Sequence, residues 1–259
     1  MARDVLSRAW KAAWLSASEN GKPHSVTANG YAAVPGAIGR GQVERAIALY
    51  CNVEKTVAEF GGIDICVNNA SAISLTNSQM TDMKRFDLMM GINTRGTFMV
   101  SKYCIPHLKK ADNPHILMLS PPLDMSAKWF KNHVAYTMAK FGMSMCVLGM
   151  SEEYRGQIAF NALWPRTGIA TAAIEFALAG EEGLKHCRTV DIMADAAHAV
   201  FEKDAKSFTG NFLIDDNFLY GEGVTDFGQY AVDPTQSLMP DFFVPDSSTP
   251  PPGVKVGPS

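Results

Sequence analysis

The sequence lacks a cysteine pattern that could cross-link a small fold. Its 259 residues include an odd number of cysteines, and no two of them are spaced as C-x-x-C. They are scattered over the chain, at Cys51, Cys66, Cys104, Cys146 and Cys187. A disulfide framework and a structural zinc site are therefore not expected, and we assign no metal ligands. A reducing, intracellular compartment is the expected location.

An excess of positive charge is also missing. The chain has 26 acidic and 23 basic residues, which gives a net charge of −3 at pH 7. A nucleic-acid-binding protein needs a basic surface, so nucleic acid is not an expected partner. No uninterrupted apolar run reaches the roughly 18 residues of a membrane span. With 47% hydrophobic and 19% charged residues, the composition is that of a folded globular protein.

The first 40 residues show no sustained hydrophobic period. Residues 1–16 combine three basic side chains with apolar residues at near-helical spacing, which fits either an ordinary amphipathic helix or an organelle transit peptide. Residues 17–41 are rich in Ser, Asn, Gly, Pro and Ala and predict loop. We therefore treat residues 1–40 as an atypical N-terminal segment.

From Gln42 onward, helical and strand-type segments alternate. Helical periods cover residues 42–60, 80–90, 94–109, 134–153, 168–178 and 191–201. Short apolar runs of strand type cover residues 63–67, 116–119, 158–163 and 211–214. This alternation predicts an α/β fold with a parallel sheet, in which the first three strands are adjacent and ligands bind at the carboxyl ends of the strands. The Pro- and Ser-rich residues 245–259 predict a flexible tail.

One predicted helix carries a tyrosine and a lysine four positions apart. Tyr136 and Lys140 fall within the segment 134–153. Positions i and i+4 share one face of a helix, so the phenol and the ammonium would lie side by side. A nearby cation stabilises the phenolate, and such a tyrosine can exchange a proton with a substrate hydroxyl or carbonyl near neutral pH. The same spacing also occurs in solvated pairs that have no catalytic role.

Further motifs accompany this pair in a fixed order. Asn68-Asn69-Ala70-Ser71 follows a strand, Asn93 lies in Asn-Thr-Arg-Gly on a helix, Ser120 follows the next strand, and Asn161-Ala162-Leu163-Trp164-Pro165 comes after the Tyr136/Lys140 pair. In this combination the chain resembles the short-chain dehydrogenase/reductase family over about residues 55–245. The turn Ser120-Pro121-Pro122 and residues 162–167 resemble its hydroxysteroid dehydrogenase-like branch.

The resemblance implies a Rossmann-like, doubly wound sheet and an oxidoreductase that uses NADP or NAD. Tyr136 would be the general acid/base, and Lys140 would tune it and hold the nicotinamide ribose. The backbone of Asn93 would help to hold a proton-relay water. The loops that line the cofactor would include Asn68, Ala70, Pro165 and Thr167. Hydride transfer would belong to the cofactor, with the protein supplying position and a proton.

The serine that would orient the substrate has two candidates. Ser120 directly follows its strand, but Pro121 occupies the position in which the family commonly has a second serine. Either Ser120 serves with altered geometry, or Ser126 serves, or the role is lost. We assign Ser120.

The N-terminus departs from the family. The family motif TGxxxGxG, which lets the cofactor pyrophosphate approach the backbone at a helix N-terminus, does not occur in this chain. The nearest glycine cluster is Gly36, Gly39 and Gly41, which is a weak motif without a clear strand before it. We therefore expect the N-terminal strand and glycine-rich loop to be atypical or missing, and cofactor binding to be impaired.

These observations divide the chain into residues 1–40, a dehydrogenase/reductase domain over 41–244, and the tail 245–259. The expected function is an NAD(P)-dependent oxidoreductase that acts on a hydroxyl or carbonyl of a small, apolar or lipid-like molecule. The alternative is a catalytically inactive protein of the same fold. The apolar side chains of residues 168–190 would line the substrate or belong to the core. The resemblance also implies a homo-oligomer, and a cytoplasmic, peroxisomal or mitochondrial location.

Overall fold

The structure is a computed structural model that describes residues 53–171, 174 and 180–257. The chain divides into two compact units. We call residues 53–162 with 204–212 the sheet unit, and the described residues of 163–203 and 213–257 the C-terminal unit. Each is described by itself. The atypical segment 1–40, with its glycine cluster, lies outside the described residues.

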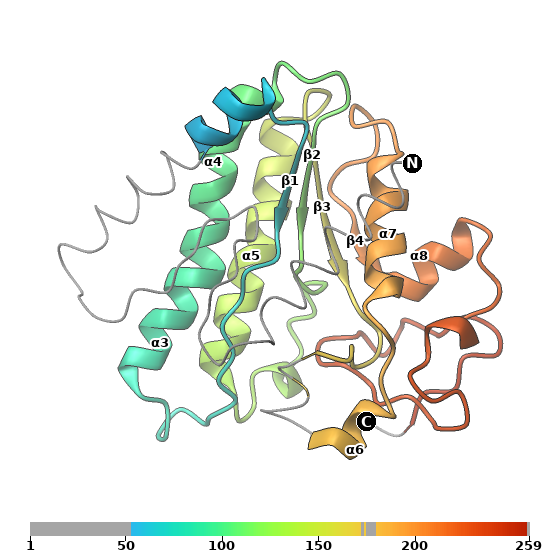
Figure 1. Cartoon of the computed structure of the whole chain (residues 1–259). Coiled ribbons are helices and arrows are strands. Elements are labelled where there is room, and N and C mark those ends of the chain that lie inside the picture. The colour runs from blue at the N-terminus through green and yellow to red at the C-terminus, as the bar shows by residue number, and fades with distance from the viewer. Residues whose placement is uncertain (1–52, 172–173, 175–179, 258–259) are drawn as a thin grey trace. The chain divides into compact units, whose positions relative to one another are not determined.

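Most of a four-stranded sheet lies in the sheet unit, and residues 163–164 and 213–214 of its last two strands are counted with the C-terminal unit (Figure 1). Its strands are β1 (Ile65–Asn68), β2 (His115–Met118), β3 (Ala159–Trp164) and β4 (Phe212–Ile214), in the order β1-β2-β3-β4. β1 pairs in parallel with β2, and β2 with β3. The first three strands are adjacent and parallel, as predicted, and every residue of β2 and β3 is buried. Their largely apolar sequences are typical of strands covered on both faces.

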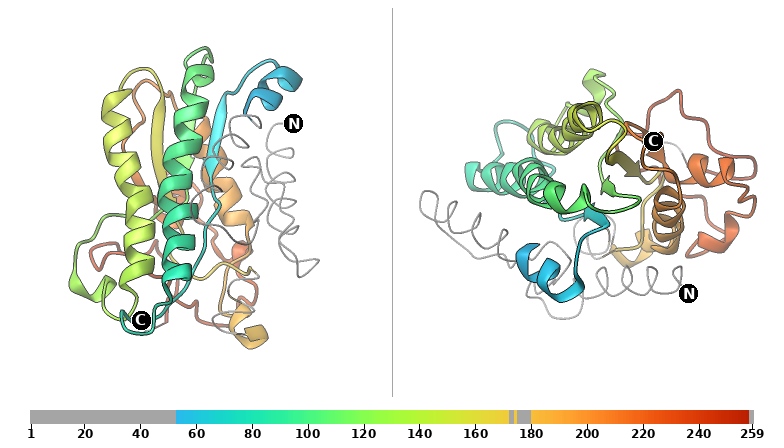
Figure 2. Two further views of the ribbon diagram at one scale, coloured as in Figure 1. Left: turned by 90° about the vertical axis from the view of Figure 1, so that its left-hand side faces the viewer. Right: turned by 90° about the horizontal axis from the view of Figure 1, so that it is seen from above.

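Helices α4 and α5 lie side by side against the sheet (Figures 1 and 2). α3 (Met83–Met89), a π-helical turn (Met90–Gly96) and α4 (Thr97–Leu108) follow one another without a break, and α5 covers Val134–Glu153. Residues 53–60 and Ala127–Trp129 form short helices. The Asp82 carboxylate caps α3 by accepting the Lys84 N–H at 2.9 Å. The predicted bounds of α5 are confirmed.

The core of the sheet unit lies between the strands and the two helices. The side chains that fill it come from the sheet, from α4 and from α5, and they include Cys66, Val100, Leu108, Ile116, Met118, Val147, Met150 and Phe160. The Tyr154 ring, at the end of α5, stacks on Phe160 with 5.7 Å between ring centroids. This packing holds α5 against β2 and β3, and so positions the residues that α5 carries.

The C-terminal unit contains α6 (Gly180–Leu184), α7 (Asp191–Phe201), α8 (Asp215–Gly221) and a short helix at Gly228–Tyr230. α7 has the predicted bounds. The helix predicted over 168–178 is wrong over residues 168–171, which are not helical. There Ile169 forms a parallel bridge with Arg188, and the Ala170 N–H bonds the Arg188 carbonyl at 2.8 Å. These strand-like bonds satisfy backbone groups that a helix would have paired locally.

The tail 245–257 makes several contacts within the C-terminal unit. Leu238 forms a parallel bridge with Val256, and the Gly257 N–H donates to the Leu238 carbonyl at 2.8 Å. The flexibility of this tail stays a prediction, and these bonds are the ones that its motion would have to break. Within the described ranges, no helix is long and apolar enough to cross a bilayer.

Candidate active site

Helix α5 carries the tyrosine and the lysine into the protein interior. Tyr136 is 6% exposed and Lys140 is 4% exposed, so the interpretation as a solvated surface pair does not hold. The Lys140 ammonium donates a hydrogen bond to the Leu119 carbonyl at 3.0 Å. Leu119 directly follows β2, so this bond places the cation at the carboxyl edge of the sheet, where parallel sheets bind their ligands.

Close packing of α5 on the π-helical turn also positions this helix. A Cβ atom at Gly142 would lie 2.2 Å from the Thr94 hydroxyl oxygen, so a larger residue there would displace the Thr94 side chain. The same hydroxyl donates to the Ala139 carbonyl at 3.0 Å. The π-helical turn therefore contacts α5 within one turn of Lys140. Single π-helical turns inside α-helices frequently mark functional sites.

Ser120 lies next to the carbonyl that binds Lys140. Its side chain is fully buried, and its hydroxyl has no hydrogen-bond partner among the described residues. Buried hydroxyls are usually paired, so this one has capacity for a ligand oxygen. On the other side of Ser120, the Pro121 carbonyl accepts a bond from the Ser144 hydroxyl at 2.6 Å. Lys140 and Ser144, one helical turn apart, thus fix the backbone on both sides of Ser120.

Ser126, the other candidate, is exposed and its hydroxyl is in use. The Ser126 backbone N–H bonds the Asp124 carboxylate at 2.9 Å, and its hydroxyl bonds the same carboxylate oxygen. The Trp129 indole donates to the second oxygen at 2.9 Å. The hydrogen bonds from Ser126 and then from Trp129 hold the pKa of the Asp124 carboxyl below its usual value. Ser126 therefore stabilises its own loop.

Two asparagines fasten the segment that follows β1. Asn93 is fully buried on the π-helical turn, where its amide accepts the Ala72 N–H at 2.8 Å and donates to the Ala72 carbonyl at 3.1 Å. Asn68, the last residue of β1, donates its side-chain N–H to the Ser101 hydroxyl at 3.0 Å. Ala70 lies half-buried between these two attachments. The loop that the sequence assigned to the cofactor is thus held in place at both ends.

Pro165 and Thr167 follow β3 and belong to the C-terminal unit. Both are buried, and the Thr167 hydroxyl has no hydrogen-bond partner among the described residues. The backbone here is strand-like: Thr167 bridges Pro240, and the Gly168 N–H donates to the Met239 carbonyl at 2.9 Å. A Cβ atom at Gly168 would come within 2.9 Å of the Cys187 sulfur, so this turn needs glycine one position after Thr167.

Neither Ser144 nor Gly142 was expected at the site from the sequence. Ser144 continues the spacing of Tyr136 and Lys140 by one more helical turn, and that spacing was the available signal. The role of Gly142 depends on Thr94, which no local pattern connects with it. No group of His, Cys, Asp and Glu side chains in the described part of the chain is arranged to hold a metal ion.

A parallel sheet with a buried tyrosine and lysine one helical turn apart defines a Rossmann-like α/β protein. The profile of the family described as Enoyl-(Acyl carrier protein) reductase matches residues 11–216, a range that begins within the segment expected to be atypical. Hydroxysteroid dehydrogenase-like protein 2 of Danio rerio is 62% identical over 192 residues, which are 74% of this chain and 46% of that protein. The chain therefore belongs to the short-chain dehydrogenase/reductase family.

Solved structures agree with this fold. A short chain dehydrogenase from Mycobacterium thermoresistibile is 48% identical, with a TM-score of 0.74 over 82% of this chain and 75% of that one. An angucycline C-6 ketoreductase with bound NADP is 22% identical, with a TM-score of 0.55 over 66% of this chain and 69% of that one, and it shows the fold alone. The matched region is about half the length of the hydroxysteroid dehydrogenase-like relative.

Proposed function

We propose that this protein is an NAD(P)-dependent oxidoreductase that interconverts a hydroxyl and a carbonyl on a small molecule. The observation that carries the proposal is the arrangement around the Leu119 carbonyl. The buried Lys140 ammonium bonds that carbonyl, and the next residue, Ser120, presents a buried hydroxyl without a partner among the described residues. Tyr136, one turn before Lys140, completes a set of proton donor, cation and hydroxyl that suits carbonyl chemistry.

Each side chain has a distinct task in this proposal. The Tyr136 hydroxyl gives a proton to the substrate oxygen during reduction and takes it back during oxidation. The Lys140 ammonium stabilises the phenolate that remains, because a nearby cation favours the charged form. The Ser120 hydroxyl donates to the substrate oxygen and so orients it. Asn93 positions the segment after β1 through Ala72.

Each unit, taken by itself, offers groups that suit a nicotinamide dinucleotide. Thr167 offers a buried hydroxyl without a protein partner, which suits a cofactor amide or phosphate oxygen. Lys140 would hold the ribose, and Asn68, Ala70 and Pro165 would line the cofactor. The cofactor supplies the hydride when it is bound. Because the chain carries no TGxxxGxG motif, we propose that it binds NADP or NAD more weakly than family members that have it.

The missing glycine motif also favours the second candidate, an inactive protein of the same fold. Two measurements separate the candidates: binding of NADPH and NADH, and turnover with a panel of apolar ketones and secondary alcohols. Slow turnover that Tyr136→Phe abolishes supports the enzyme. A chain that binds neither nucleotide and turns over no substrate supports the inactive protein.

Two finer proposals concern the substrate and assembly. Buried Ile169 and Ile174 fit a binding site for an apolar substrate, and they also fit a core. Exposed Met138, Met145 and Leu148 on α5 fit a surface for self-association. Sedimentation of the full chain tests the homo-oligomer, and a monomer at all concentrations would contradict it.

A further inference from the structure

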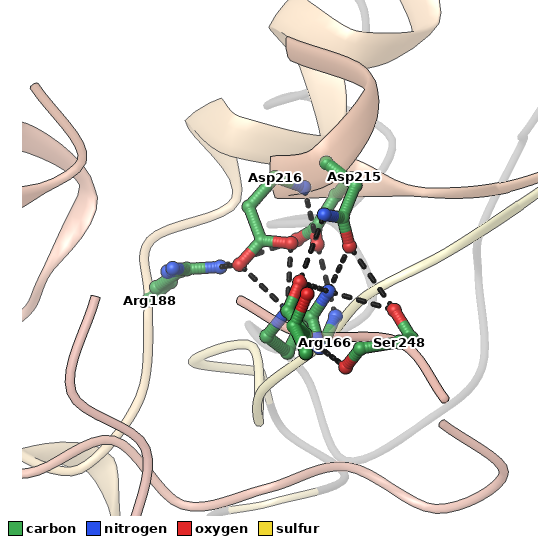
Figure 3. Close-up of polar contacts among 7 residues, drawn as sticks. Arg166, Arg188, Asp215, Asp216 and Ser248 are labelled. Carbon is green, nitrogen blue, oxygen red and sulfur yellow. Dashed lines mark hydrogen bonds and ion pairs between the residues drawn. The ribbon is translucent and has the colours of Figure 1, made fainter. Parts of the chain in front are cut away.

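Four buried charges meet in the C-terminal unit (Figure 3). Arg166 is 3% exposed, and Arg188, Asp215 and Asp216 are fully buried. The Arg166 Nε donates to both Asp216 carboxylate oxygens, at 2.8 and 2.9 Å, and the Arg188 Nη1 donates to one of them at 3.1 Å. Charges buried this deeply need partners, because removal from water is costly. The positive charges of the two arginines balance the negative charges of the two aspartates.

Arg166 also reaches beyond this cluster to the tail. Its Nη1 donates to the Ser248 carbonyl at 2.8 Å, and its Nη2 donates to the Ser248 hydroxyl at 2.9 Å and to the Thr249 carbonyl at 3.3 Å. Nη2 also bonds the Asn217 side-chain oxygen. The planar guanidinium has five N–H groups in a fixed fork, and this fork joins α8 to residues 248–249.

The backbone of Arg166 belongs to the loop that carries Pro165 and Thr167. Its N–H donates to the Asp215 carboxylate at 2.9 Å, and its carbonyl accepts the Asp241 N–H at 2.9 Å. The tail has a second attachment nearby, where the Leu238 N–H donates to the Lys255 carbonyl at 3.1 Å. One residue therefore connects the loop after β3, the start of α8 and the tail.

We propose that Arg166 is a positioning residue, and that residues 245–257 form a strap that holds Thr167 in place for the cofactor. This inference rests on the proposed function, because it assigns the strap to the same cofactor loop. The Thr167 hydroxyl has no protein partner among the described residues, so its position depends on the backbone on either side of it. Arg166 fixes that backbone from one side, and the bond between Gly168 and Met239 fixes it from the other.

The contacts of Arg166 show what a glycine at position 166 would lose. A glycine would leave Asp216 with only Arg188 and would leave residues 248–249 without the guanidinium. The loop that carries Pro165 and Thr167 and the strap therefore stabilise each other through Arg166.

The test measures amide hydrogen exchange of the full chain and of three variants. Arg166→Lys keeps a positive charge for Asp216 but lacks the guanidinium donors that bind residues 248–249. A chain that ends at Val244 lacks the strap but keeps Arg166. Arg155→Lys is the matched control, because Arg155 is an exposed arginine that pairs with Glu152 on the surface. We expect the first two changes to speed exchange of the Gly168 and Asp241 amides by about tenfold, with α5 amides and the control unchanged.

A second arm measures the affinity for NADPH, up to millimolar concentrations, and the cofactor KM and kcat. The strap predicts a weaker affinity and a raised cofactor KM with kcat retained in both altered chains. Unchanged exchange at Gly168 in both would overturn the proposal, as would faster exchange with unchanged NADPH affinity. If no form binds nucleotide, the proposed function fails, and the exchange arm still decides whether the strap holds the loop.

Discussion

The carboxyl edge of the sheet unit and the charged cluster of the C-terminal unit satisfy buried polar groups in different ways. At the sheet edge, side chains bind backbone carbonyls: Lys140 binds Leu119, and Ser144 binds Pro121. In the cluster, charged side chains bind one another, as Arg166 and Arg188 bind Asp216. The first arrangement leaves the Ser120 hydroxyl without a partner among the described residues. The second holds three chain segments together through Arg166, although Arg188 keeps two nitrogens without a hydrogen-bond partner among the described residues.

The largest expected effect is on turnover, and two substitutions at the sheet edge separate proton transfer from nucleotide binding. Tyr136→Phe removes only the proton donor, so we expect turnover to fall by a factor on the order of a hundred to ten thousand, with nucleotide affinity unchanged. Lys140→Met removes the cation and its bond to the Leu119 carbonyl, so both turnover and nucleotide affinity should fall. Steady-state rates and nucleotide titration of both variants measure this. Equal nucleotide affinity in the two variants would contradict the assigned role of Lys140.

Substitutions in the charged cluster should change the free energy of unfolding more than they change activity. Asp216→Asn leaves Arg166 and Arg188 buried without their shared carboxylate, so the free energy of unfolding should fall by about 3–5 kcal/mol. Glu182→Gln serves as the control, because it removes an exposed partner of Lys185 and should cost no more than about 1 kcal/mol. Urea unfolding measures both. A small loss of unfolding free energy for Asp216→Asn would mean that the ion pairs do not stabilise the cluster.

Asp215 gives the cluster a pH dependence. Burial first, and then the charge of Asp216, raise the pKa of Asp215 to about 6, above the ordinary 3.8. The folded protein therefore holds a proton that the unfolded chain has lost between pH 4 and 6. The contribution of Asp215 to stability is present below pH 4 and is lost as the pH rises through 6, by about 3 kcal/mol in all. Asp215→Asn should remove this slope from urea unfolding measured between pH 4 and 7, and an unchanged slope would contradict the assignment.

The close contact between Gly142 and Thr94 should have a smaller effect on stability. Gly142→Ala brings a methyl group against the Thr94 side chain, so it should destabilise the protein by about 1–3 kcal/mol. Gly149→Ala, on the same helix with open space around it, should stabilise it by about 0.5–1 kcal/mol. Thermal unfolding of the pair tests the contact directly. Equal shifts of the unfolding temperature for the two substitutions would show that the position of α5 does not depend on the close contact between Gly142 and Thr94.

The sheet edge could largely be predicted from the sequence, because its signals are local. Buried strands appear as short apolar runs, and Tyr136 and Lys140 lie four positions apart on a helix whose bounds were predicted correctly. The spacing alone also fits a solvated pair, and the family resemblance of the accompanying motifs singled it out. The helix predicted at 168–178 failed over residues 168–171 because pairing of Ile169 and Ala170 with Arg188 outweighed the local period. The role of Arg166 could not be predicted, because its partners Asp216 and Ser248 lie 50 and 82 positions further along the chain.

In the proposed enzyme, Tyr136 and Lys140 lie buried on α5, while the phosphate-binding motif of the family is missing from the sequence. Loss of two or three charge-assisted hydrogen bonds to the pyrophosphate weakens binding by a factor on the order of a thousand or more. Calorimetric titration of the full chain with NADPH and NADH tests this most directly. We predict that neither nucleotide saturates the protein at micromolar concentrations, and a micromolar dissociation constant for either one would contradict the account.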